Sequence, residues 1–224
     1  MPDTANLEIG DDKYSLEIIT GTEQEKAIDV SRLRKQSKHV TFDDGYGNTG
    51  SCESAITFID GDKGILRYRG YDIVELAEKS TFLESAYLLL YGELPNRSDL
   101  EAFKQLVGGY CDLPEEVVQV VHAQPKNAHP MAVLSSGLQA LGGVYPQFCT
   151  NDRKKDLEAF DQSAALIISS VRSIAAARYR HVNGQALPKA DSDRSYCGNF
   201  LSMMFAQGVG GEEVPESVQN ALDL

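Results

Sequence analysis

The chain has 224 residues, of which 42% are apolar and 24% are charged, and this composition excludes a mainly disordered protein. Its 33 acidic side chains outnumber its 21 basic ones, so the formal net charge is −12 and the isoelectric point is about 4.8. Such a chain is repelled by nucleic acid and by anionic membranes, and we expect neither as a partner. The only candidate basic patch is the stretch 32–38.

No apolar run approaches the roughly 20 residues that span a bilayer, and the first residues lack the pattern of a signal peptide. We therefore expect a cytoplasmic protein. The four cysteines are Cys52, Cys111, Cys149 and Cys197, and no two of them form a C-x-x-C pair. Zinc and redox motifs are thus unsupported, and in a reducing compartment we expect four free thiols.

The first third of the chain has strand character. Residues 7–9 and 14–19 predict two short strands about a turn. The stretch 41–54, which is rich in glycine, predicts an irregular connection. Residues 56–60 and 65–69 are rich in β-branched and aromatic side chains, and the turn 61–64 between them contains two glycines, which predicts a hairpin.

After Gly70 the apolar period changes from two residues to about 3.6 residues, which predicts helices. The start and stop signals are capping boxes (Thr81 with Glu84, Ser98 with Glu101), a proline followed by two glutamates (Pro114), Gly142-Gly143 and Asn183-Gly184. Together they predict helices that begin at 73, 81, 98 and 114, and further helices over 129–143, 152–181 and 192–205. A glycine-rich loop is predicted at 208–211, followed by a last helix that begins at 215 and has no stop signal before Leu224.

The four histidines give no catalytic or metal-binding pattern. His39 lies in the basic stretch and is interpreted as a surface residue. His122 and His181 end predicted helices, where a positive charge is favourable, and His129 precedes Pro130 as a cap or spacer. A zinc site made of Cys111, His122 and His129 matches no finger spacing. Reasoning from the residues alone therefore stops at a mainly α domain with a small β-rich N-terminal arm, and it assigns no catalytic, cofactor or metal residue.

Four motifs in this order and spacing nevertheless resemble the citrate synthase family, in its bacterial hexameric type. The first is SCES at 51–54 with ITFIDGDKGILRYRGY at 56–71, and the second is AYLLLYGELP at 86–95. The third is HPMAVL at 129–134. The fourth combines 184–185, 195–196, 199–201 and 203–205. Each motif is weak alone, but the four together are specific, and the similarity runs from about residue 7 to the end of the chain.

The resemblance implies an almost all-helical fold in which a large and a small domain close on the substrates. It implies condensation of acetyl-coenzyme A with oxaloacetate to citrate and free coenzyme A in the citric acid cycle, without metal or other cofactor, by a homo-oligomer (a dimer, or a hexamer built as a trimer of dimers). A carboxylate would take the methyl proton, histidines would stabilise the enol and activate the carbonyl, and arginines would hold oxaloacetate.

The family's first active-site motif, a His-Ala-Asp-His-Glu-Gln-like run, is expected just beyond Leu224. We therefore divide the chain into an arm and hairpin (1–70) and an incomplete large helical domain (71–224), with the small domain absent. No catalytic residue is carried over, and residues 1–224 alone are predicted to be inactive. Apolar side chains that the missing helices would cover are expected to be exposed, and the candidates are Leu201, Met203, Met204 and Leu222.

Some hexameric members bind the inhibitor NADH through a basic cluster. The matching positions here are Gly109, Tyr110, Leu166 and Ser170, with Tyr145 as a further match, and they supply no cations. We expect no regulation by NADH. Two alternatives to a citrate synthase fragment stay open. One is a fragment of 2-methylcitrate synthase, which uses propionyl-coenzyme A, and the other is a non-catalytic helical subunit or oligomerisation module.

Overall fold

The structure, a computed structural model, describes residues 3–191, 194–205 and 214–223, and these divide into two compact units, Met1–Ser54 and Ala55–Leu224. The strands are β1 (Thr4–Ile9), β2 (Asp12–Thr20), β3 (Lys26–Ile28), β4 (Thr57–Asp60), β5 (Ile65–Tyr68) and β6 (Tyr71–Asp72). The helices are α1 (Leu33–Ser37), α2 (Ile73–Lys79), α3 (Phe82–Tyr91), α4 (Arg97–Gly108), α5 (Glu115–Ala123), α6 (Pro130–Val144), the short 3-10 helix η1 (Pro146–Phe148), α7 (Arg153–Glu158), α8 (Phe160–Val182), α9 (Tyr196–Phe205) and α10 (Glu216–Asp223). The predicted fold class, mainly α with a small β-rich arm, is confirmed.

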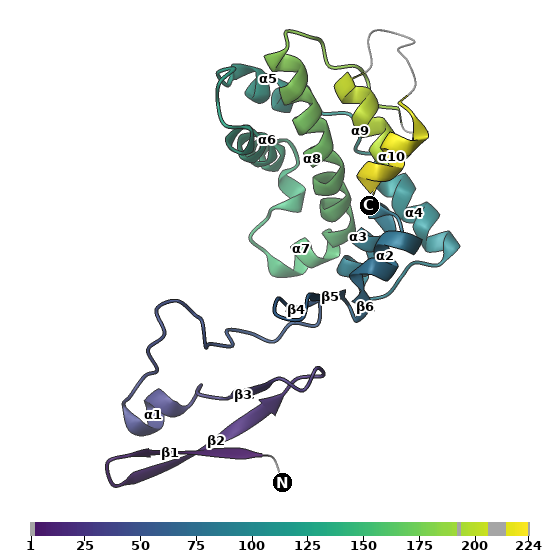
Figure 1. The fold of residues 1–224 in the computed structure, drawn as a ribbon. Coiled ribbons are helices and arrows are strands. Elements are labelled where there is room, and N and C mark those ends of the chain that lie inside the picture. The colour runs from purple at the N-terminus through teal and green to yellow at the C-terminus, as the bar shows by residue number, and fades with distance from the viewer. Residues whose placement is uncertain (1–2, 192–193, 206–213, 224) are drawn as a thin grey trace. The chain divides into compact units, whose positions relative to one another are not determined.

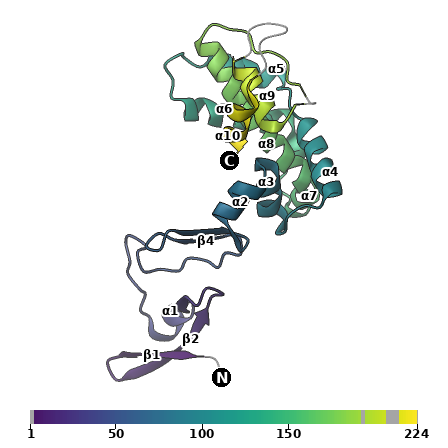
Figure 2. The same cartoon turned by 45° about the vertical axis from the view of Figure 1, so that its right-hand side comes forward.

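The first unit is an antiparallel sheet in the order β1-β2-β3, with the one-turn helix α1 after it (Figure 2). Gly10 takes the left-handed conformation that the tight turn between β1 and β2 requires. The predicted strand pair is confirmed, whereas β3 and α1 were missed because three and five residues are too few to show a period. The stretch 41–54 contains no helix or strand, as predicted.

In the second unit, β4 and β5 form the predicted hairpin, and β6 extends it and leads directly into α2 (Figure 1). The division of the chain at residue 70 stays a prediction, and in the structure the hairpin lies within the compact unit Ala55–Leu224. The Arg69 guanidinium connects it to the helices, because it donates a hydrogen bond to the carbonyl of Leu89 on α3 at 2.8 Å.

Several helix boundaries follow from capping chemistry. The capping box of Thr81 and Glu84 at the start of α3 is confirmed. The predicted box of Ser98 and Glu101 is wrong, because Asn96, in extended backbone after Pro95, accepts from the amide of Asp99 and starts α4 at residue 97. Gly142-Gly143 does not end α6, which runs to Val144 and stops where Pro146 follows.

The single long helix predicted for 152–181 is wrong, because the backbone breaks at Ala159 between α7 and α8. Asp156 of α7 accepts from both the amide and the hydroxyl of Thr150, which ties α7 to the preceding turn. Leu157 of α7 is exposed, so its side chain does not anchor α7 to the core. The end of α8 at Asn183-Gly184 is confirmed, and α9 begins at Tyr196 instead of Ser192. Ser192 itself and the predicted loop at 208–211 lie outside the described residues.

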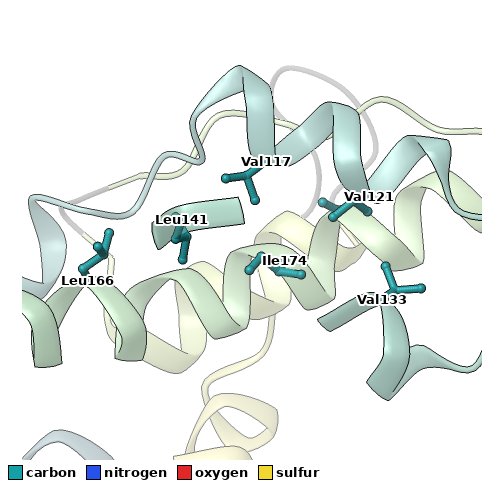
Figure 3. Packing of buried hydrophobic residues seen from close by; sticks show 7 residues of the cluster. Val117, Val121, Val133, Leu141, Leu166 and Ile174 are labelled. Carbon is teal, nitrogen blue, oxygen red and sulfur yellow. The ribbon is translucent and has the colours of Figure 1, made fainter. Parts of the chain in front are cut away.

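Helix α8 is the centre of the helical unit and contacts α4, α5, α6 and α9 (Figure 1). Figure 3 shows Val117 and Val121 of α5 pointing towards Ile174 of α8. Gly137 on α6 makes close packing possible, since a Cβ there would lie 3.0 Å from the Cγ2 of Ile174. The described part of the chain contains no helix that is both long and apolar enough to cross a bilayer.

Leu201 and Met203 are buried in the contact of α9 with the rest of the unit, so their predicted exposure is wrong. The reason is that α9 packs its apolar face on α8. Met204 is partly buried, and Leu222 is exposed as predicted.

Candidate functional site

Three arginines of α8 are almost completely buried, and we call them the arginine row. Arg172, Arg178 and Arg180 are 6%, 7% and 5% exposed. Burying a cation costs free energy unless polar groups surround it. The hydrogen-bond partners of these guanidinium groups therefore show which segments α8 holds in place. Most of the partners lie on other segments of the helical unit, and Ser169 of α8 itself accepts from Arg172 at 3.4 Å.

Arg178 holds the connection between α5 and α6. One of its terminal nitrogens donates to the backbone carbonyls of Pro125, Lys126 and Ala128 at 3.0, 2.8 and 2.9 Å. These carbonyls follow α5, where no helix bonds are available to them. The next residue is His129, whose Nδ1 accepts from the amide of Met131 and caps α6. The arginine therefore fixes where α6 begins.

Arg172 and Arg180 hold α9. Arg172 donates to the carbonyl of Tyr196 at 2.9 Å, and its guanidinium carbon lies 4.3 Å from the centre of the Tyr196 ring. Arg180 donates to the carbonyl of Met203 at 2.7 Å and to the side-chain oxygen of Gln185 at 3.0 Å. Contacts at both ends of α9 thus place it along α8.

The charge of the row is compensated mostly by dipoles. Among the described residues Arg172 and Arg178 have no ion pair with a carboxylate. Carbonyl oxygens, the Tyr196 ring and, for Arg178 and Arg180, the negative end of the α8 dipole provide the stabilisation. Burial lowers the pKa of Arg172, but an arginine stays protonated in any case. The row is therefore a fixed positive framework.

Other groups with shifted pKa values are not poised for proton transfer at neutral pH. Burial raises the pKa of Tyr196 to about 12. Burial, followed by a hydrogen bond to Asp161, raises the pKa of Tyr91 to about 12. Burial and then the Asp223 carboxylate raise the pKa of Cys197 to about 12. A general acid or base works best with a pKa near the operating pH, so these three groups are unsuited to proton transfer near neutral pH.

The histidines form no metal site in the described part of the chain. His129 is a helix cap, as predicted, and His39 is exposed, with its Nδ1 2.8 Å from the carbonyl of Ser37. The rings of His122 and His181 stack with their centres 4.9 Å apart, which the sequence did not predict. The described residues contain no group of three or more His, Cys, Asp or Glu side chains that could hold a metal ion, so the zinc alternative has no support.

All four cysteines are free thiols, as predicted, with Cys111 and Cys197 buried and Cys52 and Cys149 exposed. The thiol of Cys197 lies 3.3 Å from a carboxylate oxygen of Asp223, which links α9 to α10. These thiols therefore have structural positions.

The positions compared with an NADH site are packed with apolar groups. Leu166 belongs to the core cluster, and Tyr110 and Tyr145 pack against it with their ring centres 6.2 Å apart. Ser170 is buried, and Gly109 ends α4. The structure thus places three of the five positions in one apolar cluster.

Sequence reasoning missed the role of the arginine row. One signal could have found it: between 163 and 177, Arg172 is the one charged side chain among small and apolar residues. A helix that is small and apolar on most sides is mostly buried, and a cation within it is then buried as well.

The second unit is a mainly α-helical domain built around one buried helix, and this architecture defines the protein as a member of the mainly α class. Comparison with known proteins gives the family. The family model described as "Citrate synthase, C-terminal domain" matches residues 45–224. This match extends over most of the chain, and the chain therefore belongs to the citrate synthase family.

Solved citrate synthases are similar over most of this chain. The enzyme from Thermotoga maritima MSB8 is 36% identical with a TM-score of 0.66, covering 82% of this chain and 45% of its own. The enzyme from Thermoplasma acidophilum, solved with carboxymethyl coenzyme A and oxaloacetate, is 26% identical with a TM-score of 0.70. The match covers 80% of this chain and 45% of that enzyme's chain. The enzyme from Pyrobaculum aerophilum is 29% identical with a TM-score of 0.65, and the match covers 92% of this chain and 47% of that enzyme's chain. The chain thus spans less than half the length of these proteins.

Proposed function

We propose that the protein acts as a citrate synthase, an acyltransferase that joins acetyl-coenzyme A and oxaloacetate to give citrate and free coenzyme A. The observation that carries the proposal is the family match over residues 45–224. A similar fold in a relative that was solved with a coenzyme A analogue and oxaloacetate supports the choice of substrates. In this proposal the described residues are a scaffold, and the arginine row keeps α9 and the start of α6 in place beside the substrates.

The test uses protein expressed from the complete gene and measures release of the coenzyme A thiol that depends on oxaloacetate. Acetyl- and propionyl-coenzyme A are compared at equal concentration. We expect a higher kcat/KM with acetyl-coenzyme A. A preference for propionyl-coenzyme A would assign the protein as a 2-methylcitrate synthase, and absence of thiol release with both would contradict the proposed reaction.

We also propose that residues 1–224 alone do not catalyse this reaction. Condensation needs two substrates and the catalytic groups in one geometry. Within the described residues, the buried groups with shifted pKa values are unsuited to acid–base work at neutral pH. Thiol release by this polypeptide above a blank would contradict the proposal. Co-purification with a complementary polypeptide, without activity of the pair, would instead favour a non-catalytic subunit.

We propose that the active protein is a homo-oligomer that needs no metal, stays in the cytoplasm and is not regulated by NADH. The apolar packing of Tyr110, Tyr145 and Leu166 supports the last point. On α6, an open hollow of about 360 Å³ is lined by Met131, Leu134, Ser135, Leu138 and Gln139, and we propose it as part of the contact between subunits. Light scattering tests the oligomer, a chelator tests the metal, and saturable NADH binding would contradict the last proposal.

A further inference from the structure

The first unit has an uneven distribution of charge along the chain. Residues 1–54 carry eleven acidic and six basic side chains, yet residues 30–42 carry four of those six and no acidic side chain. This segment includes α1 and adds His39 to its cations. In a chain with a net charge of −12, such a segment is an isolated region of positive charge.

The fold places these cations on one surface. Leu33 and Ser37 of α1 are buried, and α1 contacts β2. The remaining side chains of the helix are exposed, and an open hollow of about 640 Å³ is lined by Ser31, Arg34, Lys35 and Lys38. We call this hollow the basic hollow. It is bounded by three cations and one hydroxyl group.

The cations of the basic hollow lack partners in the described residues. Arg34, Lys35 and Lys38 form no ion pair or side-chain hydrogen bond there. Elsewhere in the same unit, Lys13 pairs with Glu8 at 2.7 Å and Lys26 pairs with Asp3 at 3.2 Å. The lysines outside the hollow are therefore neutralised, whereas those that line it are not.

Local hydrogen bonds hold the hollow in shape. Lys38 has a left-handed φ of 67°, and its amide donates to the carbonyl of Arg34 at 3.0 Å. The Ser37 hydroxyl donates to the carbonyl of Leu33 at 2.9 Å and accepts from the amide of His39 at 3.0 Å. A lysine in this uncommon conformation needs such support. Arg34 and Lys38 therefore stay one helical turn apart, on one side of α1.

We propose that the basic hollow binds a small, multiply charged anion that carries a chain of phosphate groups. Three unpaired cations match several negative charges, and the Arg34 fork favours phosphate oxygens. The macrodipole of a one-turn helix is too small to require three cations at its end. A nucleic acid or an anionic membrane would extend over the acidic surroundings and be repelled, so a compact anion fits better.

The test measures binding of inorganic tripolyphosphate to the intact protein at low ionic strength, by calorimetry. We expect saturable binding, and a loss of affinity of about tenfold or more in the variant R34Q/K35Q/K38Q because charge-assisted contacts to the phosphates disappear. The control K79Q/K104Q/K154Q removes the same charge from exposed lysines that are paired with Glu75, Glu101 and Glu158. We expect the control to bind as the wild type does. Circular dichroism verifies that both variants fold.

Absence of saturable binding at about 10 mM tripolyphosphate, or an equal loss in the control, would overturn the proposal, because weak general attraction would then explain any signal. Tighter binding of a single-stranded oligonucleotide or of anionic vesicles, lost in R34Q/K35Q/K38Q, would also overturn it in favour of a macromolecular partner. Equal affinity for ATP and tripolyphosphate would support recognition of the phosphate chain alone. Tighter binding of ATP would support the same chemistry with a nucleoside attached.

Discussion

The first unit and the helical unit bury apolar side chains to very different degrees. In the described part of residues 1–54, only Leu16 and Leu33 are buried apolar side chains. The helical unit has two core clusters, and Ile174 of α8 is completely buried in one of them. The first unit depends mainly on the backbone hydrogen bonds between neighbouring strands of its sheet. The helical unit depends on side-chain contacts between segments that are distant in sequence.

The comparison predicts that the two units respond to different kinds of substitution. Apolar burial is the dominant favourable contribution to folding, so the helical unit should lose most when its core is opened. The first unit has little core to lose and should open locally at low free energy. The predictions below are ordered by their expected effect on the free energy of unfolding of the helical unit.

The largest effect is expected for Ile174→Ala. This side chain packs between α5 and α6, and its truncation leaves a cavity, so the free energy of unfolding should fall by about 2–5 kcal/mol. Urea unfolding followed by circular dichroism at 222 nm measures the change. The control Ile167→Ala lies on the same helix at 52% exposure and should change the value by about 0.5 kcal/mol or less. Equal effects of the two variants would contradict the central place of α8.

Arg178→Met should have the next largest effect. It keeps most of the apolar stem but removes the guanidinium donor from the carbonyls of Lys126 and Ala128, while the carbonyl of Pro125 still accepts from the amide of Ala128 at 2.9 Å. The free energy of unfolding should therefore fall by about 1–3 kcal/mol. Limited proteolysis should show faster cleavage in 124–128 than in the wild type. Unchanged stability with unchanged cleavage would mean that water replaces the guanidinium and that the row is not a framework.

Tyr196→Phe should lower stability at neutral pH, because the phenol no longer donates to the carbonyl of Ile168 at 2.7 Å, and should also change how stability varies at high pH. The pKa of Tyr196 is raised from 10.0 to about 12 by burial, so the folded state keeps the phenol proton more tightly than the unfolded state. Its contribution is therefore complete below about pH 10 and is lost as the pH rises towards 12. Urea unfolding at a series of pH values should show a shallower decline for the variant. The control Tyr46→Phe, at an exposed position of the first unit, should keep the wild-type slope.

Leu16→Ala should have the smallest effect on the helical unit. Leu16 is one of the two buried apolar residues of the first unit, and its truncation should open the strands β1 and β2. Hydrogen exchange should therefore accelerate at the amides of 4–20, while the amides of α8 keep their protection. Faster exchange throughout α8 would show that the two units unfold together, and the comparison would then fail.

The sequence allowed prediction of elements whose signals are local. Thr81 and Glu84 are three residues apart, and the turn residues 61–64 lie between two β-rich stretches, so neighbouring residues decide these elements. The break at Ala159 was not predictable in this way, because it depends on Thr150 holding Asp156. The start of α4 was wrong because two candidate caps, Asn96 and Ser98, compete within three residues, and only the backbone conformation decides between them.

The candidate site was harder to predict than the fold. The family was recognised from four motifs, but the arginine row depends on partners far away in sequence, such as the carbonyls of Pro125 and Tyr196. The side chains of these two residues do not indicate that an arginine binds there, because the hydrogen-bond acceptor is the backbone carbonyl. The basic stretch at 32–38 was visible as a charge pattern. That the cations lining the basic hollow are unpaired became clear only from the structure, in which Glu8 and Asp3 pair with other lysines and Asp29 attracts Arg32.

The close approach of Gly137 to Ile174 has a consequence for sequence divergence. Because a Cβ at position 137 would lie 3.0 Å from Ile174, the two positions share one fixed volume. A relative that has alanine in place of Gly137 should carry a residue without the Cγ2 methyl group, such as alanine, in place of Ile174, because valine would keep the carbon that lies closest. The order of substitution also matters, since shortening Ile174 first leaves a cavity that alanine can fill, whereas adding the methyl group first creates a clash. The two helices can therefore exchange volume along only one mutational path.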